Sequence, residues 1–151
     1  PNHPLVKGIK DGSLGPHSHY YDLSINEIEQ TNLQILALNQ NAGFFLASTP
    51  ESDLVLFQGH PEYDDKSLMK EYEREIKNFL SGSRSDYPNP PKNYFSAEIE
   101  SRLEQVKAET LKTREVIKFD NEYLHDIDLS WIDAGKTIYM NWLGLLLDSK
   151  P

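Results

Sequence analysis

The segment LVLFQGHPEYD, residues 54–64, decides how the rest of this sequence is interpreted. Its first four residues are apolar at both odd and even positions, which predicts a strand buried on both faces. Gly59 ends that strand, and His60 and Glu62 follow directly. In open α/β sheets, functional sites gather just beyond the carboxyl ends of the strands. The segment therefore predicts an α/β fold that presents an imidazole and a carboxylate at the end of a strand.

Further strands and helices are expected on both sides of this segment. A capping box formed by Ser24 and Glu27 predicts a short helical turn. Alternating or apolar runs bounded by turn residues predict two further strands, at 33–38 and 44–48, ahead of the strand that begins at Leu54. Apolar residues at helical spacing predict three helices, over 65–81, 96–117 and 138–147.

Two of the predicted helices carry expectations about burial. The charged helix at 96–117 has a narrow apolar stripe, which is expected to pack on a surface or on another helix and consists of Ile99, Leu103, Val106 and Leu111. The last helix, at 138–147, is nearly all apolar, so it must be buried against another part of the protein.

Composition limits the class of protein. The 151 residues suit one domain, and 15 Lys and Arg against 24 Asp and Glu give a formal net charge of −9. This charge disfavours binding to nucleic acids or to anionic membranes, because both need basic surfaces. Hydrophobic residues make up 38%, less than the roughly 45–50% of a typical globular domain. The chain therefore predicts a thin core, with part of the fold contributed from outside it.

Cysteine is absent from the sequence. Disulfides, thiolate metal sites and a cysteine nucleophile are therefore excluded within these residues. No apolar run is long enough to span a bilayer, and no signal-peptide pattern opens the chain. The expected location is the cytoplasm.

The spacing of His60 and Glu62 is typical of the base and its orienting partner in a nucleophilic triad. In that arrangement the imidazole takes a proton from the nucleophile, and the carboxylate fixes its tautomer. A surface turn that holds His and Glu by coincidence is the alternative that spacing alone leaves open. His17, His19 and Asp22 lie close together in sequence, but no further ligand at a recognised spacing follows, so no metal site is expected.

The block Gly59-His60-Pro61-Glu62-Tyr63-Asp64, followed by Leu68, Glu71, Tyr72 and Arg74, resembles the signature of the homoserine O-acyltransferases. These are the homoserine O-succinyltransferases and the acetyl-using enzymes related to them, which act in methionine biosynthesis. Weaker similarity lies in Pro16-His17-Ser18, Asn93-Tyr94-Phe95 and Asn141-Trp142-Leu143. His19 departs from the family pattern, which usually has Arg at this position.

The resemblance implies a sandwich fold like that of the class I glutamine amidotransferases, of which residues 1–151 would form the C-terminal half with extra C-terminal helices. It implies transfer of an acyl group from acyl-CoA, through a cysteine thioester, to the hydroxyl of L-homoserine. His60 matches the general base and Glu62 its partner carboxylate, whereas Ser18 and Arg74 match substrate-contacting positions. A guanidinium suits the carboxylate of an amino acid because it binds it through two hydrogen bonds.

Several expectations depend on the family's cysteine, which would lie in an N-terminal half outside this chain. That half is an expected partner, a homodimer is possible, and no cofactor is needed beyond the co-substrate acyl-CoA. The isolated fragment is expected to be inactive. A glutamine amidotransferase of the same fold and a non-catalytic scaffold subunit are the alternatives that the sequence leaves open.

Overall fold

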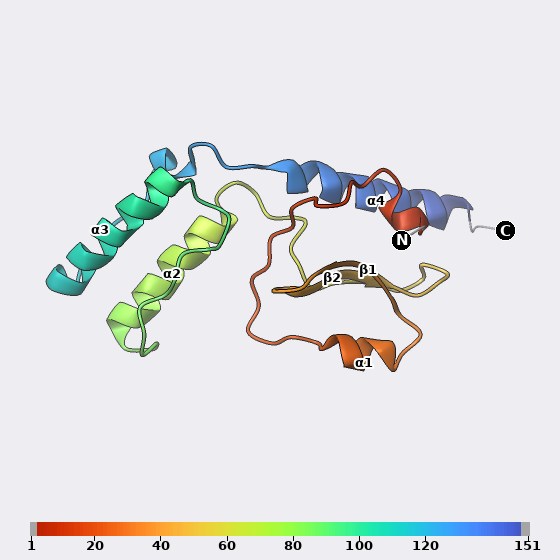
Figure 1. Ribbon diagram of the computed structural model, residues 1–151, viewed down its shortest axis with the longest axis horizontal. Coiled ribbons are helices and arrows are strands. Elements are labelled where there is room, and N and C mark those ends of the chain that lie inside the picture. The colour runs from red at the N-terminus through yellow and green to blue at the C-terminus, as the bar shows by residue number, and fades with distance from the viewer. Residues whose placement is uncertain (1–2, 149–151) are drawn as a thin grey trace. The chain divides into compact units, whose positions relative to one another are not determined.

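In the computed structural model, which describes residues 3–148, the chain divides into two units (Figure 1). The first unit contains the described residues up to Glu62 together with those from Ser130 onward, and the second spans Tyr63–Leu129. Each unit has its own helices or strands and its own buried side chains. The α/β class predicted from the sequence is confirmed.

A three-stranded antiparallel sheet lies at the centre of the first unit. Its strands are β1 (Gln34–Asn39), β2 (Gly43–Ser48) and β3 (Val55–Phe57), in the order β1-β2-β3. The first two form the predicted hairpin, in which Asn39 pairs with Gly43. Gly43 has a φ of 78°, a value that glycine adopts without the steric cost other residues carry. The predicted strand positions are therefore confirmed to within two residues.

The prediction that the third strand is buried on both faces is wrong. β3 has three residues and pairs only with β2, at the edge of the sheet described here. Leu54 and Phe57 are 47% and 41% exposed, whereas Leu46 of β2 is fully buried. An edge strand has a neighbour on one side only, so its apolar side chains gain less cover than those of the central strand.

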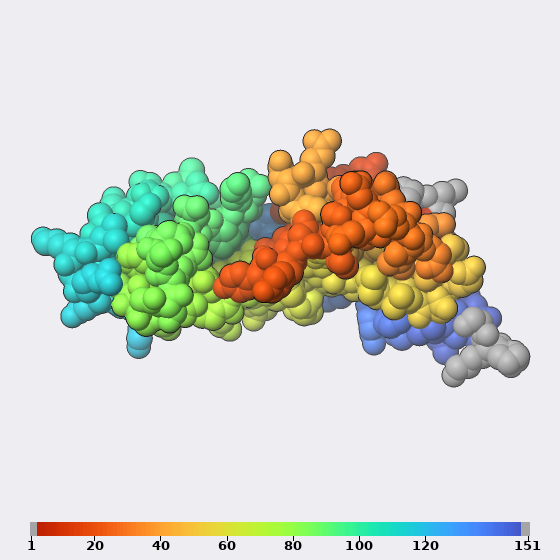
Figure 2. Space-filling model, turned by 90° about the horizontal axis from the view of Figure 1, so that it is seen from below, coloured from red at the N-terminus to blue at the C-terminus, as the bar shows by residue number. Residues whose placement is uncertain are grey.

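Helices cover both faces of this sheet (Figure 1). On one face, η1 (Pro4–Val6) and α4 (Ser130–Asp148) enclose a core of Leu5, Leu36, Leu46 and Ile138. On the other face, α1 (Ile25–Glu29) packs Ile28 against Phe44 and Ala47. The capping box is confirmed, since Ser24 and Glu27 bond each other's backbone N–H groups. Figure 2 looks onto the α1 side, where α1 and the loop before it lie on the surface.

The last helix is longer than predicted, and it is buried against the first unit's core along one face, as expected. Trp131 and Ile138 are buried, but Met140 and Leu147 are 64% and 67% exposed. Asn141 fixes the helix to the N-terminal segment, because its amide Nδ2 donates to the carbonyls of Leu5 and Lys7 at 2.9 Å each. No helix within residues 3–148 combines the length and the apolar character needed to cross a membrane.

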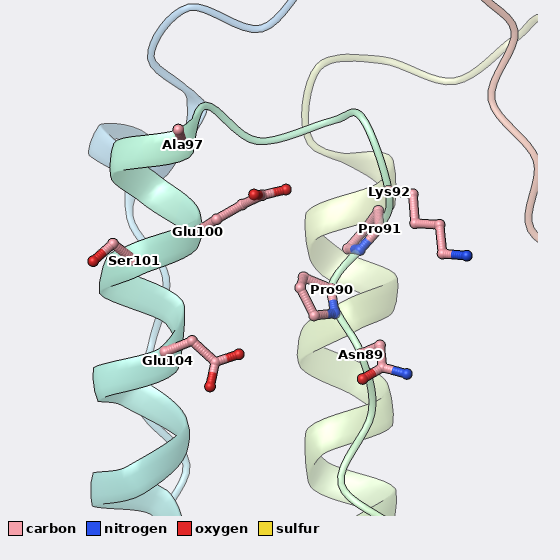
Figure 3. A pocket seen from close by; sticks show the side chains of 8 residues that line it. All are labelled: Asn89, Pro90, Pro91, Lys92, Ala97, Glu100, Ser101 and Glu104. Carbon is pink, nitrogen blue, oxygen red and sulfur yellow. The ribbon is translucent and has the colours of Figure 1, made fainter.

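The second unit is built from α2 (Ser67–Ser81), α3 (Ala97–Thr113) and the short η2 (Asn121–Leu124). The predicted end of α2 is confirmed at Gly82, which has a φ of 81°. Ser96 caps α3 by accepting a hydrogen bond from the Ile99 N–H. The two helices lie side by side (Figures 1 and 3).

The apolar stripe predicted for α3 is correct at three positions and wrong at the fourth. Ile99, Leu103 and Val106 are buried, but Leu111 is 46% exposed and the buried side chain in that turn is Thr110. Thr110 lies four residues after Val106, so it continues the same helical face. Leu111 is turned by about 100° from it, because an α-helix has 3.6 residues per turn.

Candidate functional site

The His60 imidazole lies in the loop that follows β3, and hydrogen bonds hold both of its nitrogens. Nδ1 is 2.8 Å from Oε1 of Glu62, and Nε2 is 3.1 Å from the carbonyl oxygen of Ser18. The His60 backbone N–H donates to the carbonyl of Pro16 at 2.8 Å. The His60 side chain is 30% exposed and that of Glu62 is 65% exposed. The structure therefore brings three of the four predicted site residues together: Ser18, His60 and Glu62.

Both partners of the His60 ring are hydrogen-bond acceptors. A carboxylate and a carbonyl oxygen are both acceptors, whereas a neutral imidazole carries only one N–H. Both contacts are hydrogen bonds at once only when the ring is an imidazolium. The Glu62 carboxylate and the Ser18 carbonyl thus fix the orientation of the His60 ring through both of its nitrogens.

Pro61 helps to fix the geometry of this loop. Its ring removes a backbone donor and restricts φ, so the chain between His60 and Glu62 has little freedom. Gly135 of α4 lies against Pro61, and a Cβ added at Gly135 would be 2.9 Å from the Pro61 carbonyl oxygen. The helix therefore approaches the loop closely because this helical position has no side chain.

His17 adjoins the same site, although sequence reasoning gave it no role beyond a rejected metal site. Its ring lies edge-on to that of His19, with centroids 5.7 Å apart. Burial lowers the pKa of His17, and the nearby His19 and His60 lower it further. Its Nδ1 is buried and has no hydrogen-bond partner among the described residues. A second, neutral imidazole thus lies beside the first.

The side-chain amide of Gln58 contacts both His19 and Asp22. The side-chain Nε2 of Gln58 donates to Asp22 and lies 3.3 Å from Nε2 of His19. Within residues 3–148, no group of three or more His, Asp or Glu side chains is arranged to hold a metal ion.

The fourth predicted residue, Arg74, lies on α2 in the second unit. Its Nε is 3.2 Å from Oε1 of Glu75, and its Nη1 is 3.7 Å from Oε1 of Glu71. Glu71 also accepts a hydrogen bond of 2.9 Å from the Tyr63 hydroxyl. The Arg74 side chain is 53% exposed, so pairing with its helix neighbours leaves much of the guanidinium accessible to water.

The second unit also carries an open groove of about 490 Å³. Figure 3 shows it between the linker that contains Pro90 and Pro91 and the first turns of α3, with Glu100 and Glu104 on the helix side. None of the four predicted site residues lines this groove, so the groove and the His60 loop are separate features.

Comparisons with known proteins identify one enzyme family. A family model described as homoserine O-succinyltransferase matches residues 1–150. A homoserine O-succinyltransferase of Methylobacter tundripaludum is 38% identical over 94% of this chain, and one of Methylococcus capsulatus is 39% identical over 95%. A third, of Nitrosococcus oceani, is 37% identical over 95%.

In each of these three cases the match covers 42% of the relative's own length. The chain therefore spans about two fifths of the curated relatives that it matches. The matched range of the family model includes both units of the structure and extends through α3. By this match along almost its whole length, the chain belongs to the homoserine O-succinyltransferase family.

Proposed function

We propose that this chain is the general-base part of an acyltransferase that moves an acyl group from acyl-CoA to the hydroxyl of L-homoserine. The observation that carries the proposal is the His60 imidazole, held between Glu62 and the Ser18 carbonyl in a loop that lies within the range matched by the family model. Succinyl-CoA is the first donor to test, because the relatives named above are homoserine O-succinyltransferases. Acetyl-CoA is the second.

The chemistry needs a nucleophile that these 151 residues do not contain, since they include no cysteine. In the proposed reaction, a cysteine outside this chain gives its thiol proton to His60. The thiolate then attacks the acyl-CoA carbonyl, and His60 returns the proton to the departing CoA thiolate. An acyl-enzyme thioester remains.

The second half of the reaction uses the same base. His60 takes the proton of the homoserine hydroxyl, whose oxygen attacks the thioester, and the cysteine leaves as a thiolate that recovers the proton. Glu62 would stabilise the imidazolium at both stages through Nδ1, and Nε2, which lies beside the Ser18 carbonyl, is the nitrogen that would take up and return the proton.

Two residues are proposed to contact substrate. Arg74 would bind the homoserine carboxylate through two hydrogen bonds, exchanging its exposed pairing with Glu71 and Glu75 for this contact. The Ser18 hydroxyl would bind a polar group of the substrate, while its carbonyl remains on His60.

The wider assembly is also part of the proposal. The chain would be the C-terminal part of a sandwich like that of the class I glutamine amidotransferases, located in the cytoplasm, with the nucleophile supplied by an N-terminal half. The relatives' greater length supports this, because the matched region covers 42% of each. No cofactor is required beyond the acyl-CoA co-substrate, a homodimer is compatible with the scheme, and the 151-residue chain alone would be inactive.

The test incubates the complete protein with homoserine and either succinyl-CoA or acetyl-CoA, and measures O-acylhomoserine and free CoA. One donor should give product, and glutamine should release no ammonia. Ammonia from glutamine without acyl transfer would replace the proposal with an amidotransferase. No reaction with any of these substrates would leave a scaffold role.

A further inference from the structure

The aromatic ring of Phe45 lies beneath the loop that carries His60. Phe45 belongs to β2 and is partly buried against the core on the α4 face. The His17 ring packs edge-on to it with centroids 5.4 Å apart, and the Phe57 ring does so at 6.1 Å. Phe45 therefore contacts a residue of the loop before α1 and a residue of β3, which are 40 positions apart in the sequence.

Two glycines make room for this ring. A Cβ added at Gly15 or at Gly59 would overlap the Phe45 side chain. Neither glycine is among those with positive φ, which are Gly8, Gly12, Gly43 and Gly82. The backbone conformations of Gly15 and Gly59 thus suit other residues, and the requirement at both positions is space. Each loop has a residue without a side chain where it passes the Phe45 ring.

The backbone of Phe45 holds one of the same loops. Its carbonyl oxygen accepts from the N–H groups of Gln58 at 3.1 Å and Gly59 at 3.4 Å. The next residue, His60, donates its N–H to Pro16 in the other loop. A ladder of contacts therefore runs from β2 through Gly59 and His60 to Pro16, with the Phe45 ring filling the space beside it.

From this packing we infer that Phe45 is a positioning residue for His60. Its ring sets the separation of the two loops, and so lets the Ser18 carbonyl and the Glu62 carboxylate reach the two nitrogens of one imidazole. The effect on acyl transfer rests on the proposed function. The effect on the imidazole rests on the packing alone, so the two can be tested separately.

A smaller side chain at position 45 should let the loops move relative to each other. Displacement of a catalytic group by about 1 Å can cost 10²-fold in rate. In the complete protein, Phe45→Leu should therefore lower kcat by about 10–100-fold. Both KM values should stay within about 2-fold, because Phe45 is not proposed to touch substrate.

The neighbouring Phe44 provides a matched control. It is also a phenylalanine of β2, is 2% exposed, and packs in the other core with Ile28 and Ala47. Phe44→Leu removes the same atoms from the same strand and should lower stability without changing kcat.

The decisive readout is the ¹⁵N NMR signal of the His60 ring in the complete protein labelled at histidine. Phe45→Leu should change the ¹⁵N shifts of the His60 ring, and Phe44→Leu should leave them as in the parent. Equal changes in the two variants, or none in Phe45→Leu, would overturn the inference.

If Phe45→Leu does not fold, Gly59→Ala tests the same contact from the loop side with β2 unchanged. It should perturb the His60 ring signals, and unaltered signals would overturn the inference. Absence of acyl transfer in the parent protein would refute the proposed function only, since the NMR comparison does not depend on turnover.

Discussion

His60 and Arg74 are held in place by two different kinds of contact. His60 is fixed by Ser18, 42 positions away, and by the Pro16 carbonyl, in addition to its neighbour Glu62. Arg74 pairs with Glu71 and Glu75, which are three positions and one position away on the same helix. The contacts of the imidazole depend on the tertiary fold of the first unit, whereas these two ion pairs of the guanidinium lie within one helix.

This difference indicates that the orientation of His60 is fixed, whereas the orientation of Arg74 can change. Local pairs on exposed helix surfaces contribute little and reorganise readily, which suits a side chain that must turn to a substrate. A ring whose two nitrogens both have fixed partners is already organised for the charge that the proposed reaction would place on it. The largest effects of mutation are therefore expected at His60 and the smallest at local contacts of the second unit.

The largest expected effect is that of His60→Ala. It should lower acyl transfer by the complete protein by about 10³-fold or more, because the nucleophile loses its base. The measurement is steady-state formation of O-acylhomoserine.

His125→Ala is the matched control, since His125 also pairs with a carboxylate, that of Asp126 at 2.8 Å, but is 78% exposed. It should retain full activity. An equal loss in both variants, or normal turnover in His60→Ala, would contradict the comparison.

Glu62→Gln should have the next largest effect. The amide keeps the shape of the side chain but lacks the charge that stabilises the imidazolium, so kcat should fall by about 10–100-fold. Glu51→Gln, on the exposed turn between β2 and β3, is the control. Unchanged kcat in Glu62→Gln, measured at the pH optimum, would reduce Glu62 to a structural residue.

Arg74→Lys should change substrate binding rather than the chemical step. A lysine cannot form two parallel hydrogen bonds to a carboxylate, so the KM for homoserine should rise by about 10-fold. The KM for acyl-CoA should remain unchanged. Arg84→Lys is the control, because Arg84 also pairs with Glu75 in this unit. Equal rises in both KM values would argue against a carboxylate contact.

The smallest expected effect is that of Ser96→Ala, which removes the N-cap of α3. It should lower the free energy of unfolding by about 1 kcal/mol without changing the kinetics. Urea denaturation measures the change, with Ser101→Ala on the exposed surface of the same helix as control. A fall in kcat in Ser96→Ala, with no such fall in Ser101→Ala, would contradict this prediction.

Local signals were sufficient to predict much of this structure. The capping box at Ser24 was predicted from side chains that bond the nearby backbone, and it is confirmed. The predicted helix boundaries at 81 and 96 also have local causes, since Gly82 adopts a positive φ and the Ser96 side chain accepts from a backbone N–H. The pairing of His60 with Glu62 was predictable for the same reason, because the two lie two positions apart.

Features that depend on distant parts of the chain were not predictable from the pattern. The Ser18 carbonyl reaches His60 only because two loops meet over Phe45, and no periodicity encodes that meeting. The apolar run at 54–57 indicated a buried strand, but burial depends on how many strands flank it, and β3 has one neighbour here. Gly15 and Gly59 were the only signals of the close packing, and composition gives them no special meaning.

The most direct test of the account is the rate of acylation in a single turnover. The complete protein, in excess over acyl-CoA, is quenched at short times, and the acyl adduct is located by mass spectrometry in the parent and in His60→Ala. The account predicts an adduct on a cysteine outside these 151 residues, formed at least about 10³-fold more slowly without the imidazole. An adduct that forms equally fast in both proteins would contradict it.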